Sequence, residues 1–123
     1  MISAKSNSNN LKTEFSNGNL TAYADAPEQF GGKEQGFLPS ELLEASIACC
    51  MNLYARVFAD NHNIPAKEIT TKVTLDKNNE EESVLECDIK VEGDLTEEQL
   101  KKLENAVKAC PMKQALQKKI IFK

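Results

Sequence analysis

Apolar residues surround almost the whole circumference of one predicted helix, which runs from Glu41 to roughly Asp60. Its polar exceptions recur at roughly four-residue spacing and form a narrow stripe: Glu44, Asn52, Arg56 and Asp60. A helix that is apolar on nearly every side must be buried on most of them. A single chain of 123 residues has few other elements to cover such a helix, so we expect a second copy to supply part of the cover.

Two segments after this helix alternate between apolar and polar residues, as half-buried strands do. The first runs from Glu68 to Asp76 and the second from Val84 to Glu92, with a polar turn between them. In the second strand the inward residues are Leu85, Cys87, Ile89 and Val91. We expect an antiparallel pair, with Cys87 in the core.

Before the helix, Thr13 to Ala24 reads as a hairpin with a type I′ turn at Asn17-Gly18. Residues 1–10 are rich in Ser and Asn and are either frayed or a weak first strand. The segment from Asp25 to Leu38 has no periodicity and is long enough to be a functional loop. Ser40 follows as the predicted helix N-cap, with Glu41 in the first turn.

The C-terminal part predicts two helices and a strand. A capping box at Thr96 to Gln99 opens the first helix, which ends near Ala109. Its buried face carries Leu100, Leu103, Ala106 and Val107. A short helix follows from Pro111 to about Lys118, and residues 120–122 form a final strand. The order of elements is α+β, and the length fits a single domain over residues 1–123.

Charge and composition exclude several classes of function. The net charge is −4 and Arg56 is the only arginine, so there is no basic stripe for nucleic acid. The polar start of the chain, Met1 to Asn19, has no apolar core of a signal peptide. The longest apolar stretch, Ile47 to Ala59, is too short for a membrane span. We therefore expect a cytoplasmic protein that contacts neither nucleic acid nor membrane, with free or catalytic thiols.

Two of the four cysteines occupy positions where a thiol becomes reactive. Cys110 precedes Pro111 and is the predicted N-cap of the last helix, where free N–H groups and the helix dipole favour a thiolate. Cys50 lies in the apolar helix, where packing and chemistry are equally plausible from the residues alone. For Cys49, packing is the better interpretation. A redox pair of Cys50 and Cys110 requires that the fold bring them together.

Other kinds of site find little support. His62, the only histidine, would lie about 18 Å along the helix axis from Cys50, which disfavours a metal site and a Cys–His pair. The glycines lack the spacing of a phosphate-binding loop. We expect neither metal nor cofactor.

Two motifs resemble those of the OsmC/Ohr family (osmotically inducible protein C and organic hydroperoxide resistance). The run from Pro39 to Cys50 fits the pattern P-x-E-L-L-x-A-x-x-A-x-C, which carries the family's peroxidatic cysteine. The run from Ala109 to Leu116 is similar to the second motif, in which a Cys-Pro pair opens a helix and supplies the resolving cysteine. The loop from Asp25 to Gly36 and the order of elements also fit, over about residues 10–123.

This resemblance implies an OsmC-like fold: an N-terminal hairpin or meander, a long buried central helix, then strands and two helices, in an intertwined homodimer. It also implies reduction of organic hydroperoxides. The Cys50 thiolate would attack the peroxide, Cys110 would form a disulfide with the resulting sulfenic acid, and an external dithiol would reduce it.

The chain departs from the family's best-known members at two positions. Ser40 replaces a glutamate ten residues before the first cysteine, although Glu41 is adjacent, and the N-terminal arginine that holds the thiolate is missing. Lys12 or Lys33 could supply a charge but not the bidentate geometry of arginine. The chain therefore resembles a divergent OsmC-like branch. The alternative function is a non-enzymatic dimer that senses redox state or binds a small molecule.

Overall fold

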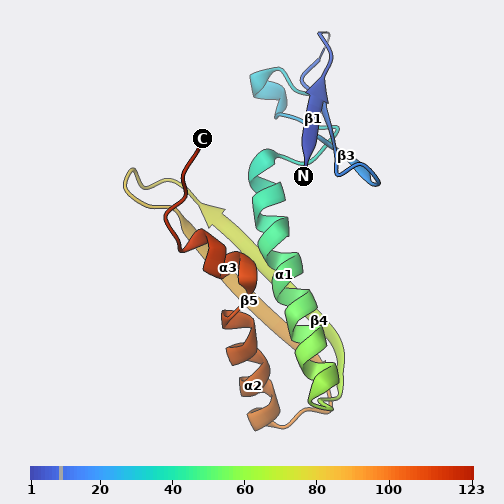
Figure 1. Cartoon of the computed structure of the whole chain (residues 1–123), viewed down its shortest axis with the longest axis vertical. Coiled ribbons are helices and arrows are strands. Elements are labelled where there is room, and N and C mark those ends of the chain that lie inside the picture. The colour runs from blue at the N-terminus through green and yellow to red at the C-terminus, as the bar shows by residue number, and fades with distance from the viewer. Residues whose placement is uncertain (9) are drawn as a thin grey trace. The chain divides into compact units, whose positions relative to one another are not determined.

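A computed structural model describes residues 1–8 and 10–123, so that Asn9, which falls within the segment expected to be frayed or a weak strand, lies outside the described residues. The elements follow the α+β order predicted from the sequence (Figure 1). The chain divides into two compact units, Met1–Leu43 and Glu44–Lys123.

The first unit contains an antiparallel sheet in the order β1–β2–β3, formed by Ser3–Ser6, Thr13–Ser16 and Thr21–Ala24. The weak first strand therefore exists, as β1. The predicted two-residue type I′ turn is wrong, because Ser16 pairs with Thr21 and leaves a four-residue loop. The side chain of Asn17 accepts the N–H groups of Asn19 and Leu20 at 2.9 and 2.8 Å, and this bonding favours the longer loop.

The loop that follows β3 is organised around the carboxylate of Asp25. This side chain is only 5% exposed. It accepts backbone N–H groups from Ala26 at 2.8 Å, Gln35 at 3.1 Å and Lys33 at 3.3 Å. Those bonds, led by the one from Ala26, lower the pKa of Asp25. The loop, which includes a short 3-10 helix at Glu28–Phe30, thus has a structural centre.

The long helix α1 spans Pro39–Asn61 and begins before its predicted N-cap. Ser40 therefore lies inside the first turn, and its assignment as N-cap is wrong. Proline suits the first helical position because its φ is already helical and the N–H that it lacks would be unpaired there. The carboxylate of Glu41 accepts the N–H of Leu38 at 2.8 Å, which ties the preceding residue to the helix start.

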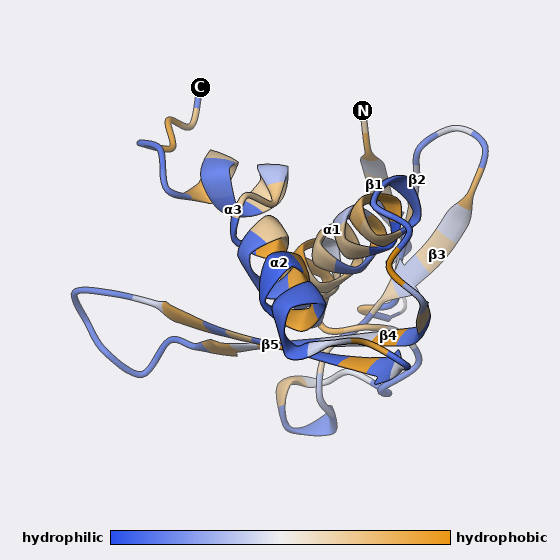
Figure 2. Cartoon of the chain, turned by 90° about the horizontal axis from the view of Figure 1, so that it is seen from below, coloured by the Kyte–Doolittle hydropathy of each residue, from blue (hydrophilic) through white to orange (hydrophobic). Residues whose placement is uncertain are grey.

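The second unit places three helices on one face of a two-stranded antiparallel sheet (Figures 1 and 2). The strands are β4 (Ala66–Asp76) and β5 (Val84–Gly93), as the alternation predicts. The helices are α1, α2 (Glu97–Lys108) and α3 (Pro111–Leu116). The capping box of α2 is confirmed: the Thr96 hydroxyl accepts the N–H of Gln99 at 3.2 Å, and the Gln99 side chain accepts the N–H of Thr96 at 3.0 Å.

The core of this unit is built on a single stripe of α1, with one residue from each turn. The buried residues of α1 are Ile47, Met51, Ala55 and Ala59. Around them pack Ile64, Ala66, Ile69, Leu103, Val107 and Cys110. In the single chain the opposite face of α1 is open, with Leu53 67% and Val57 56% exposed. The prediction that α1 is buried on most sides is therefore not met by one copy of the chain.

The polar stripe of α1 bonds to β4. Glu44 accepts the N–H of Leu75 at 2.7 Å. Asn52 donates to the carbonyl of Ile69 at 2.8 Å, and Arg56 donates to the carbonyl of Ala66 at 2.7 Å. These side chains satisfy backbone groups that β4 does not use in pairing with β5. The stripe thus explains why polar residues interrupt an otherwise apolar helix, and it protects one edge of the sheet from pairing with another strand.

Two other sequence expectations are corrected in this unit. Cys87 lies on the same face as Leu85 but is exposed, because it borders a cavity between β5, α3 and α1 instead of packing in the core. The predicted strand at residues 120–122 is not formed in the described part of the chain, and Phe122 is 95% exposed. Strand pairing needs a neighbouring strand, and the described residues of this unit bring none to the C-terminal segment.

Among the described residues, α1 is long and apolar enough to cross a membrane by length and composition. Its 23 residues extend beyond the apolar stretch Ile47 to Ala59 on which the sequence interpretation was based. A core helix passes the same test, and one such helix is weak evidence for a span.

Candidate functional site

The structure brings together the two cysteines that the motifs single out. Cys50 projects from α1 and Cys110 precedes α3, and their thiols lie close enough to influence each other's ionisation. Cys110 is completely buried, whereas Cys50 is half-buried. A redox pair of Cys50 and Cys110 required that the fold bring them together, and the fold does so.

The position of Cys110 follows from the way in which α2 ends. Its N–H donates to the carbonyl of Val107 at 3.2 Å, in a last tight turn of the chain. Pro111 then starts α3, and Cys110 is its N-cap, as predicted. Leu103, Val107 and Cys110 are all buried in one core cluster with Ile47 and Met51 of α1. The core contacts that fix α2 against α1 therefore also fix the Cys110 thiol beside Cys50.

The surroundings of Cys50 favour the neutral thiol. Burial is the largest cause that raises its pKa, followed by the hydrogen bond with Cys110 and by repulsion from a charge on Cys110. The backbone N–H of Met112 acts in the opposite direction but does not reverse the shift. In the free chain, Cys50 is therefore less ionised at neutral pH than an ordinary cysteine.

A shallow cavity of about 390 Å³, largely open to solvent, lies beside Cys50. Its lining is mostly apolar and comes from α1 and the start of α3: Ser46, Cys49, Cys50, Leu53, Tyr54, Val57 and Pro111. Cys49 is exposed there. It is therefore a surface thiol, and the expectation that it packs in the core is wrong. Cys50 can thus be reached from the cavity, whereas the fully buried Cys110 lies behind it.

The weaker candidates belong to the first unit and have partners there. The ammonium of Lys12 lies 4.3 Å from the ring centroid of Tyr23. Lys33 donates its backbone N–H to Asp25 and has an exposed side chain. Ser40 and Glu41 lie in the first turn of α1, where Glu41 bonds to Leu38.

Arg56, the only arginine, is engaged in the fold. Besides its bond to the carbonyl of Ala66, it pairs with Asp60 at 3.7 Å. It therefore holds α1 to β4.

Sequence reasoning missed two features of the site. One is the backbone N–H of Met112, which reaches Cys50 only because α3 begins at Pro111. The other is the cavity itself, with Leu53, Tyr54 and Val57 as its wall. The offsets of three, four and seven residues from Cys50 place these side chains on its face of the helix, so a helical projection around Cys50 could have found the wall.

Comparison with known proteins identifies the family. The family model described as OsmC-like protein matches residues 31–123, so the chain belongs to the OsmC-like family. A search of curated proteins finds no match.

Solved structures with the same fold include three bacterial proteins. An OsmC-like protein from Mycoplasma pneumoniae superposes with a TM-score of 0.77 at 21% identity, covering 95% of this chain and 86% of that one. An osmotic stress and detoxification response protein from Psychrobacter arcticus gives 0.74 at 24% identity, covering 91% and 85%. An organic hydroperoxide resistance protein from Legionella pneumophila gives 0.68 at 21% identity, covering 95% and 88%. At these identities the likeness shows the fold, and the predicted OsmC-like fold of the single chain is confirmed.

Proposed function

We propose that this protein is a thiol peroxidase that reduces organic hydroperoxides, with Cys50 as the peroxidatic and Cys110 as the resolving cysteine. The observation that carries this proposal is the proximity of the two thiols, at a site where Cys50 faces a cavity and Cys110 is buried. A peroxidatic thiol must be accessible to the substrate, whereas a resolving thiol needs only to contact the oxidised peroxidatic cysteine.

The proposed chemistry has three steps that balance. The Cys50 thiolate attacks the outer oxygen of the hydroperoxide, the O–O bond breaks, and the alcohol leaves with a proton while Cys50 becomes a sulfenic acid. The Cys110 thiol then attacks the Cys50 sulfur, and a disulfide forms with release of water. Finally an external dithiol exchanges with this disulfide, is oxidised itself and returns both cysteines to thiols.

The mostly apolar lining of the cavity favours a substrate with an alkyl or aryl group. Leu53, Val57 and Pro111 can shield such a group from water, which contributes binding energy in proportion to the buried area. Two of the structurally similar proteins, from Legionella pneumophila and Bacillus subtilis, are named organic hydroperoxide resistance proteins, and those names agree with this substrate class.

We propose that the active form is a homodimer in the cytoplasm. The open face of α1, with Leu53, Tyr54 and Val57 exposed, is the main support. The exposed apolar C-terminus at residues 120–122 is a second, because a segment of this composition pairs readily with a strand of another chain. Covering either surface with a second copy removes apolar area from water.

The rate of hydroperoxide reduction should be modest at neutral pH. The nucleophile is the thiolate, and the raised pKa of Cys50 keeps its fraction low. Arg56 is engaged with β4 and Asp60, so it does not activate Cys50 within its own chain.

The direct test is consumption of cumene hydroperoxide with excess dithiothreitol. The wild-type protein should react faster than a free thiol at the same pH, and Cys50→Ser should abolish the excess rate. Cys87→Ser is the matched control, because it makes the same Cys-to-Ser change at an exposed thiol of β5, outside the proposed site, and should leave the rate unchanged. A wild-type rate no higher than that of the free thiol would contradict the proposal that the protein is a peroxidase.

A binding function would then take its place. One structurally similar protein, an organic hydroperoxide resistance protein from Vibrio cholerae, has captopril bound in one of its active sites. The cavity beside Cys50 could hold a small apolar or thiol-containing molecule in the same manner. Saturable binding of captopril without any hydroperoxide turnover would favour this alternative.

A further inference from the structure

A second and larger cavity lies on the sheet side of α1, apart from the one beside Cys50. Its volume is about 550 Å³, within the range of roughly 300–1,000 Å³ that is typical of small-molecule sites. Its lining comes from β5, α3 and α1: Ile47, Ser83, Leu85, Cys87, Lys113, Leu116 and Gln117. Neither Cys50 nor Cys110 lines it, so the proposed peroxidase chemistry does not use this space.

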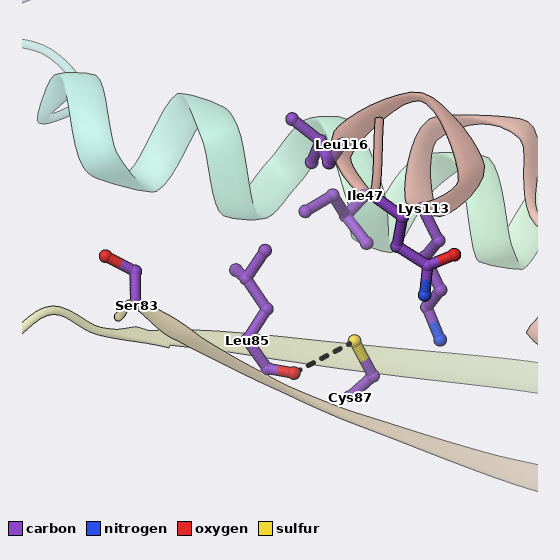
Figure 3. A pocket seen from close by; sticks show the side chains of 7 residues that line it. Ile47, Ser83, Leu85, Cys87, Lys113 and Leu116 are labelled. Carbon is purple, nitrogen blue, oxygen red and sulfur yellow. Dashed lines mark hydrogen bonds between the residues drawn. The ribbon is translucent and has the colours of Figure 1, made fainter. Parts of the chain in front are cut away.

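The walls of this cavity separate into an aliphatic floor and a polar rim (Figure 3). Leu85 rises from β5 toward Ile47 of α1 and Leu116 of α3, and together they form the aliphatic part. Cys87 lies one pleat further along β5, with its thiol bonded weakly to the carbonyl of Leu85 at 3.7 Å. Burying a hydrocarbon chain against this floor would be favourable because the chain and the open parts of the half-buried Leu85 and Leu116 both leave water.

The rim contributes one positive charge that the fold leaves unpaired. Within residues 1–8 and 10–123, Lys113 forms no ion pair and no hydrogen bond through its ammonium group, although its side chain is half-buried. Ser83 and Gln117 supply neutral donors on the same rim. A single cation beside neutral donors matches a head group with one negative charge, and a bond from an ammonium to a carboxylate is about twice as strong as a neutral one.

From this arrangement we infer that the cavity binds an amphipathic monocarboxylate, with its hydrocarbon chain on Ile47, Leu85 and Leu116 and its carboxylate on Lys113. The site is separate from the proposed peroxidase site and does not depend on it. Cys87 provides a built-in reporter, since a ligand that fills the cavity must cover the thiol on its wall.

The experiment measures how fast N-ethylmaleimide labels Cys87 in the reduced full-length protein, by peptide mapping at increasing concentrations of decanoate. Saturating decanoate should slow the labelling at least tenfold. In Lys113→Gln the concentration that gives half-protection should rise roughly tenfold, because the charge-assisted bond is lost. Lys118→Gln, which removes an exposed lysine outside the cavity, should match the wild type. Decanol should protect wild type and Lys113→Gln alike.

Three results would overturn the inference. One is Cys87 labelling that decanoate does not slow. Another is equal protection in wild type and Lys113→Gln, which would mean that the carboxylate does not meet this lysine. The last is a Cys87 that resists labelling before any ligand is added, which would show that a second copy of the chain covers the cavity.

Discussion

Cys50 of α1 and Cys110 at the start of α3 bring their thiols into proximity, although one is half-buried and the other is completely buried. This asymmetry in exposure distinguishes their proposed roles. An attacking hydroperoxide can reach Cys50 from the cavity that it lines, whereas Cys110 can react only with a group already at Cys50.

Replacing Cys110 with serine should separate the two halves of the cycle. Cys110→Ser should consume about one hydroperoxide per Cys50 and then stop as a sulfenic acid, because the resolving thiol is needed only after the first step. The sulfenic acid can be trapped with dimedone and located by mass spectrometry. The assay contains no added thiol. Continued turnover of Cys110→Ser at the wild-type rate under this condition would show that another residue resolves the intermediate.

The reactivity of Cys50 should increase with pH, and the increase should occur at higher pH than the ionisation of a free cysteine. Its pKa is raised first by burial and then by Cys110, so at neutral pH the thiol predominates and the thiolate appears only as the pH rises. Alkylation of Cys50 by iodoacetamide, followed peptide by peptide against pH, measures this midpoint. Cys110→Ala should lower the midpoint, since the hydrogen bond and the charge repulsion both disappear. A midpoint below that of a free thiol would mean that an activating cation lies near Cys50 in solution.

The sequence predicted much of this fold because its patterns are local. Alternation located β4 and β5, and the capping box placed the start of α2 within one residue. The proline after Cys110 gave the N-cap of α3. Each of these signals depends on neighbours within a few residues, which a single sequence shows directly.

The errors arose where distant residues decide the outcome. Cys87 alternates like a core residue, but it faces a cavity between β5 and the helices, and a strand pattern does not reveal such a cavity. The apolar run at residues 120–122 has the composition of a strand but no neighbour to pair with in its own unit. The contact of Cys50 with Cys110 could be expected from the family's motifs, whereas the role of Met112 and the shape of the cavity needed coordinates.

The dimer proposal predicts a single dimeric species in sedimentation at micromolar protein concentration. Leu53→Glu should weaken the dimer because it places a charge in the exposed apolar face of α1. Lys101→Glu, an exposed position on α2, serves as the control and should leave association unchanged. A folded wild-type monomer at this concentration would contradict the proposal.

The polar stripe of α1 should be essential although it interrupts an apolar helix. Asn52→Leu would leave the carbonyl of Ile69 without its donor and remove the contact with Thr71, so we expect a loss of about 1–3 kcal/mol in the free energy of unfolding. Urea denaturation measures the change. Asn19→Leu, at an exposed loop position, should cost much less. An equal loss of stability in the two variants would contradict the claim that the polar stripe holds β4.

The central claim is that Cys50 and Cys110 form one redox pair, and the most direct test is the disulfide that oxidation creates. The reduced protein would be treated with an equimolar amount of cumene hydroperoxide, quenched with an alkylating agent at low pH and mapped by proteolysis. The account predicts a disulfide between Cys50 and Cys110, with Cys49 and Cys87 recovered as alkylated thiols. A bond from Cys110 to Cys49 instead, or a Cys50 that remains a thiol after the peroxide is consumed, would contradict it.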